Sequence, residues 1–134
     1  MNMNLVARVL FPARFGLALA SMARGKFDRA ARRLELLCIE SNGSLQPLES
    51  NDIDPGGSRF VSLGECYLEL GRIRDAVRMF DHAYESYRGL HLSSRRELSS
   101  NRDYREFLNR FADALRSLGD VQRASRLEAE AEDL

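Results

Sequence analysis

The sequence contains little of the chemistry on which catalysis depends. It has no tryptophan, its two histidines are His82 and His91, and it lacks a glycine-rich loop of the kind that binds phosphate. Because catalysis requires titratable groups that act together, no reaction class is indicated, and we expect a non-enzymatic protein without a cofactor. His82 and Glu85 share one face of an expected helix, but no further ligand is near in sequence. We therefore expect a surface histidine and no metal site.

Long apolar runs are absent as well. Arg8, Arg14 and Arg24 interrupt the apolar N-terminal region, so no stretch reaches the roughly eighteen residues that a membrane-spanning helix needs. The net charge is zero, from twenty basic and twenty acidic side chains, and the acids are interleaved with the arginines. We therefore expect neither a membrane span nor nucleic-acid binding.

The two cysteines, Cys38 and Cys66, both fall within apolar helical patterns. A reduced, buried thiol is the usual occupant of such a position, and we expect no disulfide. The helical neighbours of Cys66 include no cation that would lower its pKa, which argues against a nucleophilic role. Reduced thiols suit a reducing compartment, so the expected location is the cytoplasm.

Charge is distributed unevenly along the chain. The N-terminal region is basic and contains a single acid, Asp28, whereas the C-terminal region is acidic. The basic residues are Arg8, Arg14, Arg24, Lys26, Arg29, Arg32 and Arg33, and the acids at the other end are Glu128, Glu130, Glu132 and Asp133. The basic N-terminal region and the acidic C-terminal region are candidate docking surfaces.

The strongest periodic pattern lies on either side of Gly71. Small and large apolar residues recur there at helical spacing, namely Phe60, Leu63, Gly64, Tyr67, Ala76, Phe80 and Ala83. Gly71 stands where a helix C-terminus commonly requires a left-handed residue, and Asp75 places a negative charge in the first turn of the next helix. The segment predicts two helices joined by a tight turn.

These residues resemble the tetratricopeptide repeat, in which small and large side chains alternate so that two antiparallel helices interlock. The closing proline of the family pattern is missing, since Arg88 stands near its place. The register recurs less completely at Leu17, Ala18, Ser21, Gly25, Ala30, Leu34 and Leu37, and at Leu108, Phe111, Ala112, Leu115, Gly119, Ala124 and Ala131. The resemblance implies an all-α solenoid of three helical hairpins.

We expect a single domain, residues 1–134, with hairpins at about 14–41, 58–87 and 104–132. The turn glycines are farther apart than the roughly 34 residues of the family, so additional residues must lie between hairpins. Residues 42–57 are rich in turn formers and predict a surface loop. Residues 88–101 predict either a loop or extensions of the flanking helices, and we prefer extension.

The two ends of the stack are expected to be atypical. Residues 1–11 predict an extra N-terminal helical segment that ends at Pro12. After Leu127 the last helix becomes polar, which would prevent further stacking. Because acids at a helix C-terminus oppose its dipole, we expect this tail to fray.

The first helix of each hairpin has a second face that the core does not use. We expect this face to be the partner-binding site. The alternative is a solvated face without a partner. Its residues are Phe15, Leu19 and Met22, then Val61, Ser62, Glu65, Leu68 and Glu69, then Asn109, Arg110, Asp113 and Arg116. One subclass of the family binds the C-terminal carboxylate of a partner with cationic and amide side chains at the corresponding positions. That clamp is absent, because Phe15 and Leu19 occupy its first-repeat positions.

Phe15, Leu19 and Met22 form an apolar patch that something must cover. Three occupants remain open: residues 1–11 folded back over the patch, a second copy of the chain, or a helix or peptide of another protein. The acids on the other two hairpins favour a partner segment that also carries basic residues.

These features favour a protein-interaction module, an adaptor or small chaperone that binds a helical or extended segment of another protein. The word chaperone rests on analogy with the family alone. Two alternatives stay open: an inhibitor that resembles a toxin-immunity protein, and a self-associating structural subunit built through residues 1–22.

Overall fold

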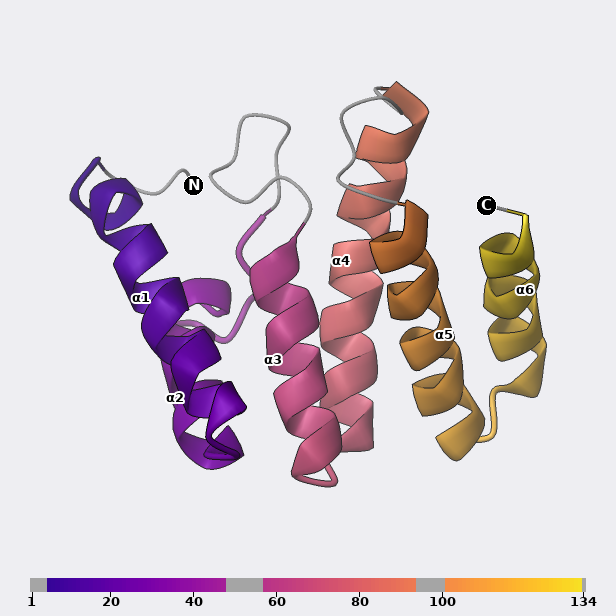
Figure 1. Ribbon diagram of the computed structural model, residues 1–134, viewed down its shortest axis with the longest axis horizontal. Coiled ribbons are helices and arrows are strands. Elements are labelled where there is room, and N and C mark those ends of the chain that lie inside the picture. The colour runs from indigo at the N-terminus through magenta and orange to yellow at the C-terminus, as the bar shows by residue number, and fades with distance from the viewer. Residues whose placement is uncertain (1–4, 48–56, 94–100, 134) are drawn as a thin grey trace.

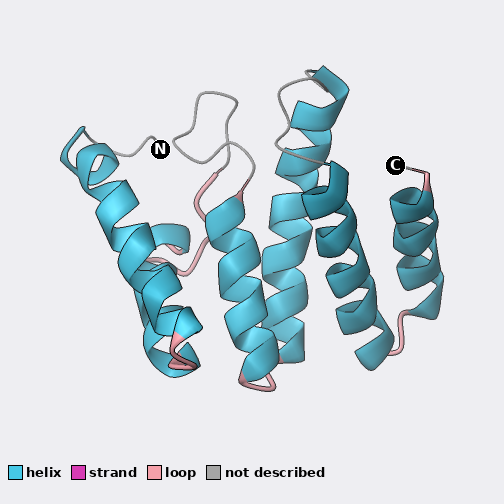
Figure 2. Cartoon of the chain, viewed as in Figure 1, coloured by secondary structure: helices cyan, strands magenta, loops and turns pink. Residues whose placement is uncertain are grey.

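The computed structural model describes residues 5–47, 57–93 and 101–133, and the regular structure of these segments is helical apart from one isolated bridge between Ile39 and Leu45 (Figure 2). The predicted all-α class is therefore confirmed. The six helices are α1 (Leu5–Ala23), α2 (Phe27–Cys38), α3 (Ser58–Glu69), α4 (Ile73–Ser93), α5 (Asn101–Ser117) and α6 (Val121–Glu132).

Neighbouring helices pack in pairs, and the pairs pack on each other in chain order. Helix α1 pairs with α2, α3 with α4, and α5 with α6, while α2 also packs on α3 and α4 on α5. Figure 1 shows the resulting row, with α1 at one end and α6 at the other. Each element therefore contacts mainly its neighbours in sequence, and within the described segments α1 and α6 each have one side without a neighbouring pair.

The three turns within the pairs have the same geometry. Gly25, Gly71 and Gly119 have left-handed φ angles of 73°, 77° and 88°, which favour glycine because a side chain would be strained there. In each turn the residue after the glycine donates its amide to the carbonyl five residues earlier: Lys26 to Ser21, Arg72 to Tyr67, and Asp120 to Leu115, at 2.9, 2.8 and 2.9 Å. This hydrogen bond satisfies one of the last carbonyls of each first helix.

Small residues stand where the two helices of a pair cross. Ala18, Gly64 and Ala112 precede their turn glycines by the same interval and are fully buried. The contact is tightest at Gly64, where an added Cβ would lie 2.5 Å from Cε1 of Phe80. Phe80 also contacts the rings of Phe107 and Phe111 on α5, at centroid distances of 5.8 and 5.9 Å. One aromatic ring thus joins two successive pairs.

Leu17 matches the repeat register but differs in burial from its counterparts. Its counterparts Leu63 and Phe111 are fully buried, but the Leu17 side chain is 54% exposed. The reason is position in the row: among the described residues, no helix pair lies against the side of α1 that carries Leu17.

The extra N-terminal segment ending at Pro12 is also not found among the described residues. Helix α1 continues through Pro12, so residues 5–11 belong to the same helix as Phe15 and do not fold back over it. Phe11 is buried and its ring lies 5.5 Å from that of Phe15. Burying a phenylalanine contributes roughly 2 kcal/mol, which offsets much of the roughly 3 kcal/mol that an interior proline costs.

The acidic end of α6 is anchored, contrary to the expectation that it frays. The Glu130 carboxylate accepts hydrogen bonds from the Tyr84 hydroxyl at 2.8 Å and the Tyr104 hydroxyl at 2.5 Å. The guanidinium of Arg105 donates to the carbonyl of Ala131 at 3.2 Å, which satisfies an oxygen near the helix terminus. These tertiary contacts outweigh the unfavourable dipole interaction of the acids.

The first part of the expected loop 42–57 is packed against α4, and residues 48–56 lie outside the described segments. The guanidinium of Arg78 donates to the Gly43 carbonyl at 3.0 Å, and His82 Nε2 lies 2.7 Å from the Gln46 carbonyl oxygen. The His82 ring also packs edge-on against Phe60 at 4.6 Å. His82 is therefore a half-buried residue that holds the loop, and not the surface histidine expected from the sequence.

Candidate functional site

The expected site residues occupy equivalent positions on α1, α3 and α5. Counted back from each turn glycine, they form three rows: Phe15, Val61 and Asn109; Leu19, Glu65 and Asp113; and Met22, Leu68 and Arg116. Ser62 and Arg110 form a further equivalent pair, and Glu69 follows Leu68. We call this set the first-helix face. Across every row the side chains change from apolar on α1 to polar on α5.

The α1 end of the first-helix face is apolar and partly accessible. Phe15 and Met22 are half-buried and pack against the core, whereas Leu19 is 42% exposed. On α3, Val61 and Leu68 are likewise half-buried against the core. The apolar side chains of the face therefore have their inner sides in the core and part of their surface in water.

Glu65 lies at the middle of the face and contacts the next hairpin. Its carboxylate forms an ion pair with Arg110 at 3.0 Å, which joins α3 to α5. Burial raises the pKa of the Glu65 carboxyl above its usual value, and Arg110 opposes this rise by favouring the charged form. Glu106 and Glu69 raise the Glu65 pKa further, so three carboxylates and one guanidinium share this part of the face.

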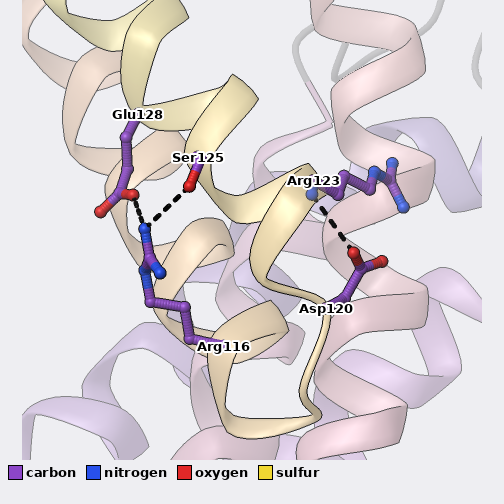
Figure 3. A network of polar contacts seen from close by, with 5 residues as sticks. All are labelled: Arg116, Asp120, Arg123, Ser125 and Glu128. Carbon is purple, nitrogen blue, oxygen red and sulfur yellow. Dashed lines mark hydrogen bonds and ion pairs between the residues drawn. The ribbon is translucent and has the colours of Figure 1, made fainter.

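The α5 end of the face is polar, and one of its residues faces elsewhere. Asn109 and Asp113 are exposed. Arg116 extends to α6, where its guanidinium lies 3.3 Å from the Ser125 hydroxyl and pairs with Glu128 (Figure 3). Nearby, the Asp120 carboxylate accepts from the Arg123 amide at 3.2 Å and caps α6. Arg116 is therefore used within its own hairpin, while Glu65 and Arg110 are brought together between hairpins.

Sequence reasoning missed two charged residues of this region. Glu106 lies one helical turn before Arg110, and that spacing on a helix was the signal that could have found it. Arg59 is 1% exposed, donates Nε–H to the Leu37 carbonyl at 2.9 Å, and lies over the rings of Phe60 and Phe11 at 4.9 and 5.8 Å. Its burial had no sequence signal, because an arginine beside an apolar helix start is usually exposed.

The chemistry available elsewhere in the chain is limited. Burial raises the pKa of the Cys66 thiol to about 11, with Glu65 and Glu69 adding to the rise, so its nucleophilic thiolate is disfavoured. Both cysteines are buried, reduced thiols. Among the described residues, no group of three histidine, cysteine or acidic side chains is placed to hold a metal ion. In the same segments, no helix combines the length and apolar character needed to cross a bilayer.

Comparison of this chain with protein-family models, with curated proteins and with solved structures finds no match.

Proposed function

We propose that this chain is a tetratricopeptide-like interaction module, an adaptor or small chaperone of the cytoplasm, that binds a helical or extended segment of another protein along the first-helix face. Three helix pairs with the same left-handed glycine turn and the same hydrogen bond across it support a repeat architecture. The two buried, reduced cysteines fit a reducing compartment.

The observation that carries the proposal is the composition of the first-helix face. A helix face that serves only solvation is polar along its length, but here one end exposes Leu19 beside the half-buried Phe15 and Met22. The next helices carry accessible acids on the same face, Glu69 on α3 and Asp113 on α5. An apolar area beside accessible acids is typical of a surface that binds a protein segment.

The ion pair between Glu65 and Arg110 defines which acids a partner can use. Because Glu65 is already paired at 3.0 Å, a partner cation would have to compete with Arg110 for it. Glu69 and Asp113 are exposed. We therefore expect the partner segment to place apolar residues on α1 and basic residues toward Glu69 and Asp113.

The test is affinity capture from a lysate of the native host with three proteins run side by side. The first is the unchanged chain, the second carries Glu69→Arg and Asp113→Arg, and the third carries Leu19→Glu. Both variants alter exposed side chains, so far-ultraviolet circular dichroism should show unchanged helicity. We expect a captured protein, identified by mass spectrometry, to lose at least about tenfold of its enrichment on each variant, equivalent to about 1.4 kcal/mol of binding free energy.

Glu132→Arg with Asp133→Arg is the matched control, because it makes the same charge change as the double variant at two exposed positions at the end of α6. Capture that persists in all variants would move the site away from the first-helix face. Capture of the chain itself and nothing else would support a self-associating subunit. A single, tightly held folded toxin would support the immunity-like inhibitor.

A further inference from the structure

A second surface, distinct from the first-helix face, lies at the α1 end of the row. In the second and third hairpins, one side of the first helix meets the preceding hairpin through Arg59 on α3 and through Phe107 and Phe111 on α5. Leu63 and Cys66 on α3 and Ala114 on α5 share that side by helical spacing. The equivalent residues on α1, counted from Gly25, are Ala13, Leu17 and Ala20. We call these three residues the end surface.

Within the row, this side of the helix is covered by the second helix of the preceding pair. Arg59 of α3 donates to the Leu37 carbonyl of α2 at 2.9 Å. On α5, Phe107 and Phe111 pack against the Phe80 ring of α4 at 5.8 and 5.9 Å, and Phe111 also contacts Tyr84 at 6.1 Å. All six residues of α3 and α5 in these positions are buried.

On α1 the same side is exposed and apolar. Leu17 is 54% exposed, Ala13 and Ala20 are exposed, and Val9 extends the surface with 69% exposure. Gly16 lies beside them with no atom within 4 Å of its would-be Cβ. Small residues around Leu17 let another helix approach the α1 backbone closely. The end surface thus resembles the sides of α3 and α5 that contact the preceding hairpin, but no second helix among the described residues covers it.

The contacts between successive hairpins also show which charge a helix that covers the end surface would carry. At each junction an acid of the preceding second helix reaches the following hairpin: Glu35 accepts from the Tyr67 hydroxyl at 2.6 Å, and Asp81 pairs with Arg123 at 2.5 Å. The residue equivalent to Arg123 in the first hairpin is Arg29, which is exposed beside the exposed Lys26. Helix α1 itself contains no acid.

We propose that the end surface binds an amphipathic helix of a partner protein, whose apolar residues cover Leu17 and whose acidic residues pair with Arg29 and Lys26, as α2 covers α3 and α4 covers α5. A second copy fits less well. Two α1 helices would bring no acid to Arg29, and the outer side of α6 offers the polar residues Ser125, Glu128 and Glu132 in place of an apolar surface. Within the described residues, the outer side of α6 is thus polar, whereas the end surface on α1 is apolar.

The experiment uses two labelled peptides of about 18 residues, long enough for five helical turns. The acidic peptide has leucine and phenylalanine on one face and glutamate on the other, and its twin has lysine in place of every glutamate. Fluorescence anisotropy is measured with the full chain, with Leu17→Glu and with Arg29→Glu. We expect the full chain to bind the acidic peptide at least about tenfold more tightly than the twin, and each variant to weaken that binding at least about tenfold.

Arg126→Glu, an equal charge change at an exposed position on α6, is the matched control and should leave binding unchanged. Glu69→Arg should also leave it unchanged, which separates this surface from the first-helix face. No binding of the acidic peptide, equal binding of the two peptides, or an equal loss with Arg126→Glu would overturn the proposal. A dimer that is detected by light scattering and that Leu17→Glu dissociates would also overturn the proposal, because a second copy would then occupy the end surface. Tight binding to phosphatidylserine vesicles without binding of the acidic peptide would assign the surface to a membrane.

Discussion

Single residues at the helix crossings set how closely the helices approach. Gly64 faces the Phe80 ring, which in turn contacts α5, so space at Gly64 affects two pairs. A glycine inside a helix costs roughly 1 kcal/mol relative to alanine, and here the loss is offset by the packing of the ring. Packing at this crossing therefore favours glycine at position 64, although helix propensity favours a residue with a side chain.

Gly64→Ala is expected to destabilise the chain by about 1–3 kcal/mol, because its Cβ would meet Phe80 carbons at 2.5 and 2.7 Å. The free energy of unfolding in urea measures this effect. Gly16→Ala is the control, since no atom lies within 4 Å of its Cβ position on α1. It should stabilise the chain by roughly 0.5–1 kcal/mol. A stabilising Gly64→Ala would show that the ring can move aside.

At the level of elements, α1 differs from the other helices because it is apolar on more than one side. Its inner side supplies Phe11 and Ala18 to the core, while its outer side exposes Val9 and Leu17. Helical periodicity indicates an amphipathic helix only when the second side is polar, and α1 does not meet that condition. The break expected at Pro12 rested on proline's local preference, and the helix continues there because Phe11 on the inner side is buried in the core.

Pro12→Ala is expected to raise the free energy of unfolding by about 1–3 kcal/mol. Proline lacks the amide donor of an interior helical residue and crowds the preceding turn, and Pro12 lies within the continuous helix α1. Thermal unfolding followed by circular dichroism measures the change. A separate segment that ends at Pro12 would show no gain from the substitution, and that result would contradict a continuous α1.

For the whole molecule, two tyrosine hydroxyls join successive hairpins. Tyr67 of α3 donates to Glu35 of α2 at 2.6 Å, and Tyr84 of α4 donates to Glu130 of α6 at 2.8 Å. Burial raises the pKa of both tyrosines, and the hydrogen bond to a carboxylate adds to the rise because it favours the protonated form. The coupling between hairpins thus depends on neutral tyrosines.

Stability is expected to fall between pH 10 and pH 12. The pKa of Tyr84 is raised from 10.0 to about 12, so in this window the folded chain keeps a proton that the unfolded chain has lost. Stability therefore decreases as pH rises through this window, whereas below pH 10 the contribution of Tyr84 to stability is fully present and does not change with pH. The check is the free energy of urea unfolding at several alkaline pH values. Tyr84→Phe should lose about 1 kcal/mol at neutral pH and show a shallower alkaline decline. An unchanged decline would assign it to other groups.

Much of the fold was predictable because its determinants are local. Each turn needs a left-handed glycine at the end of a helix, and Gly25, Gly71 and Gly119 stand at those positions. The small residues at the crossings, such as Gly64, were equally visible as a recurring pattern. The expected site residues share equivalent helix positions, because helical periodicity determines which side chains lie on one face.

The amino-acid sequence by itself determined the helices, their turns and the residues that can interlock, since these depend on spacing along a single chain. The tertiary structure alone decided which faces are covered. It left Leu17 exposed although its counterparts are buried, paired Glu65 with Arg110, and anchored the acidic end of α6 through Glu130. The physical reason is that burial and ion pairing depend on neighbouring elements, and periodicity within one helix carries no information about which element lies beside it.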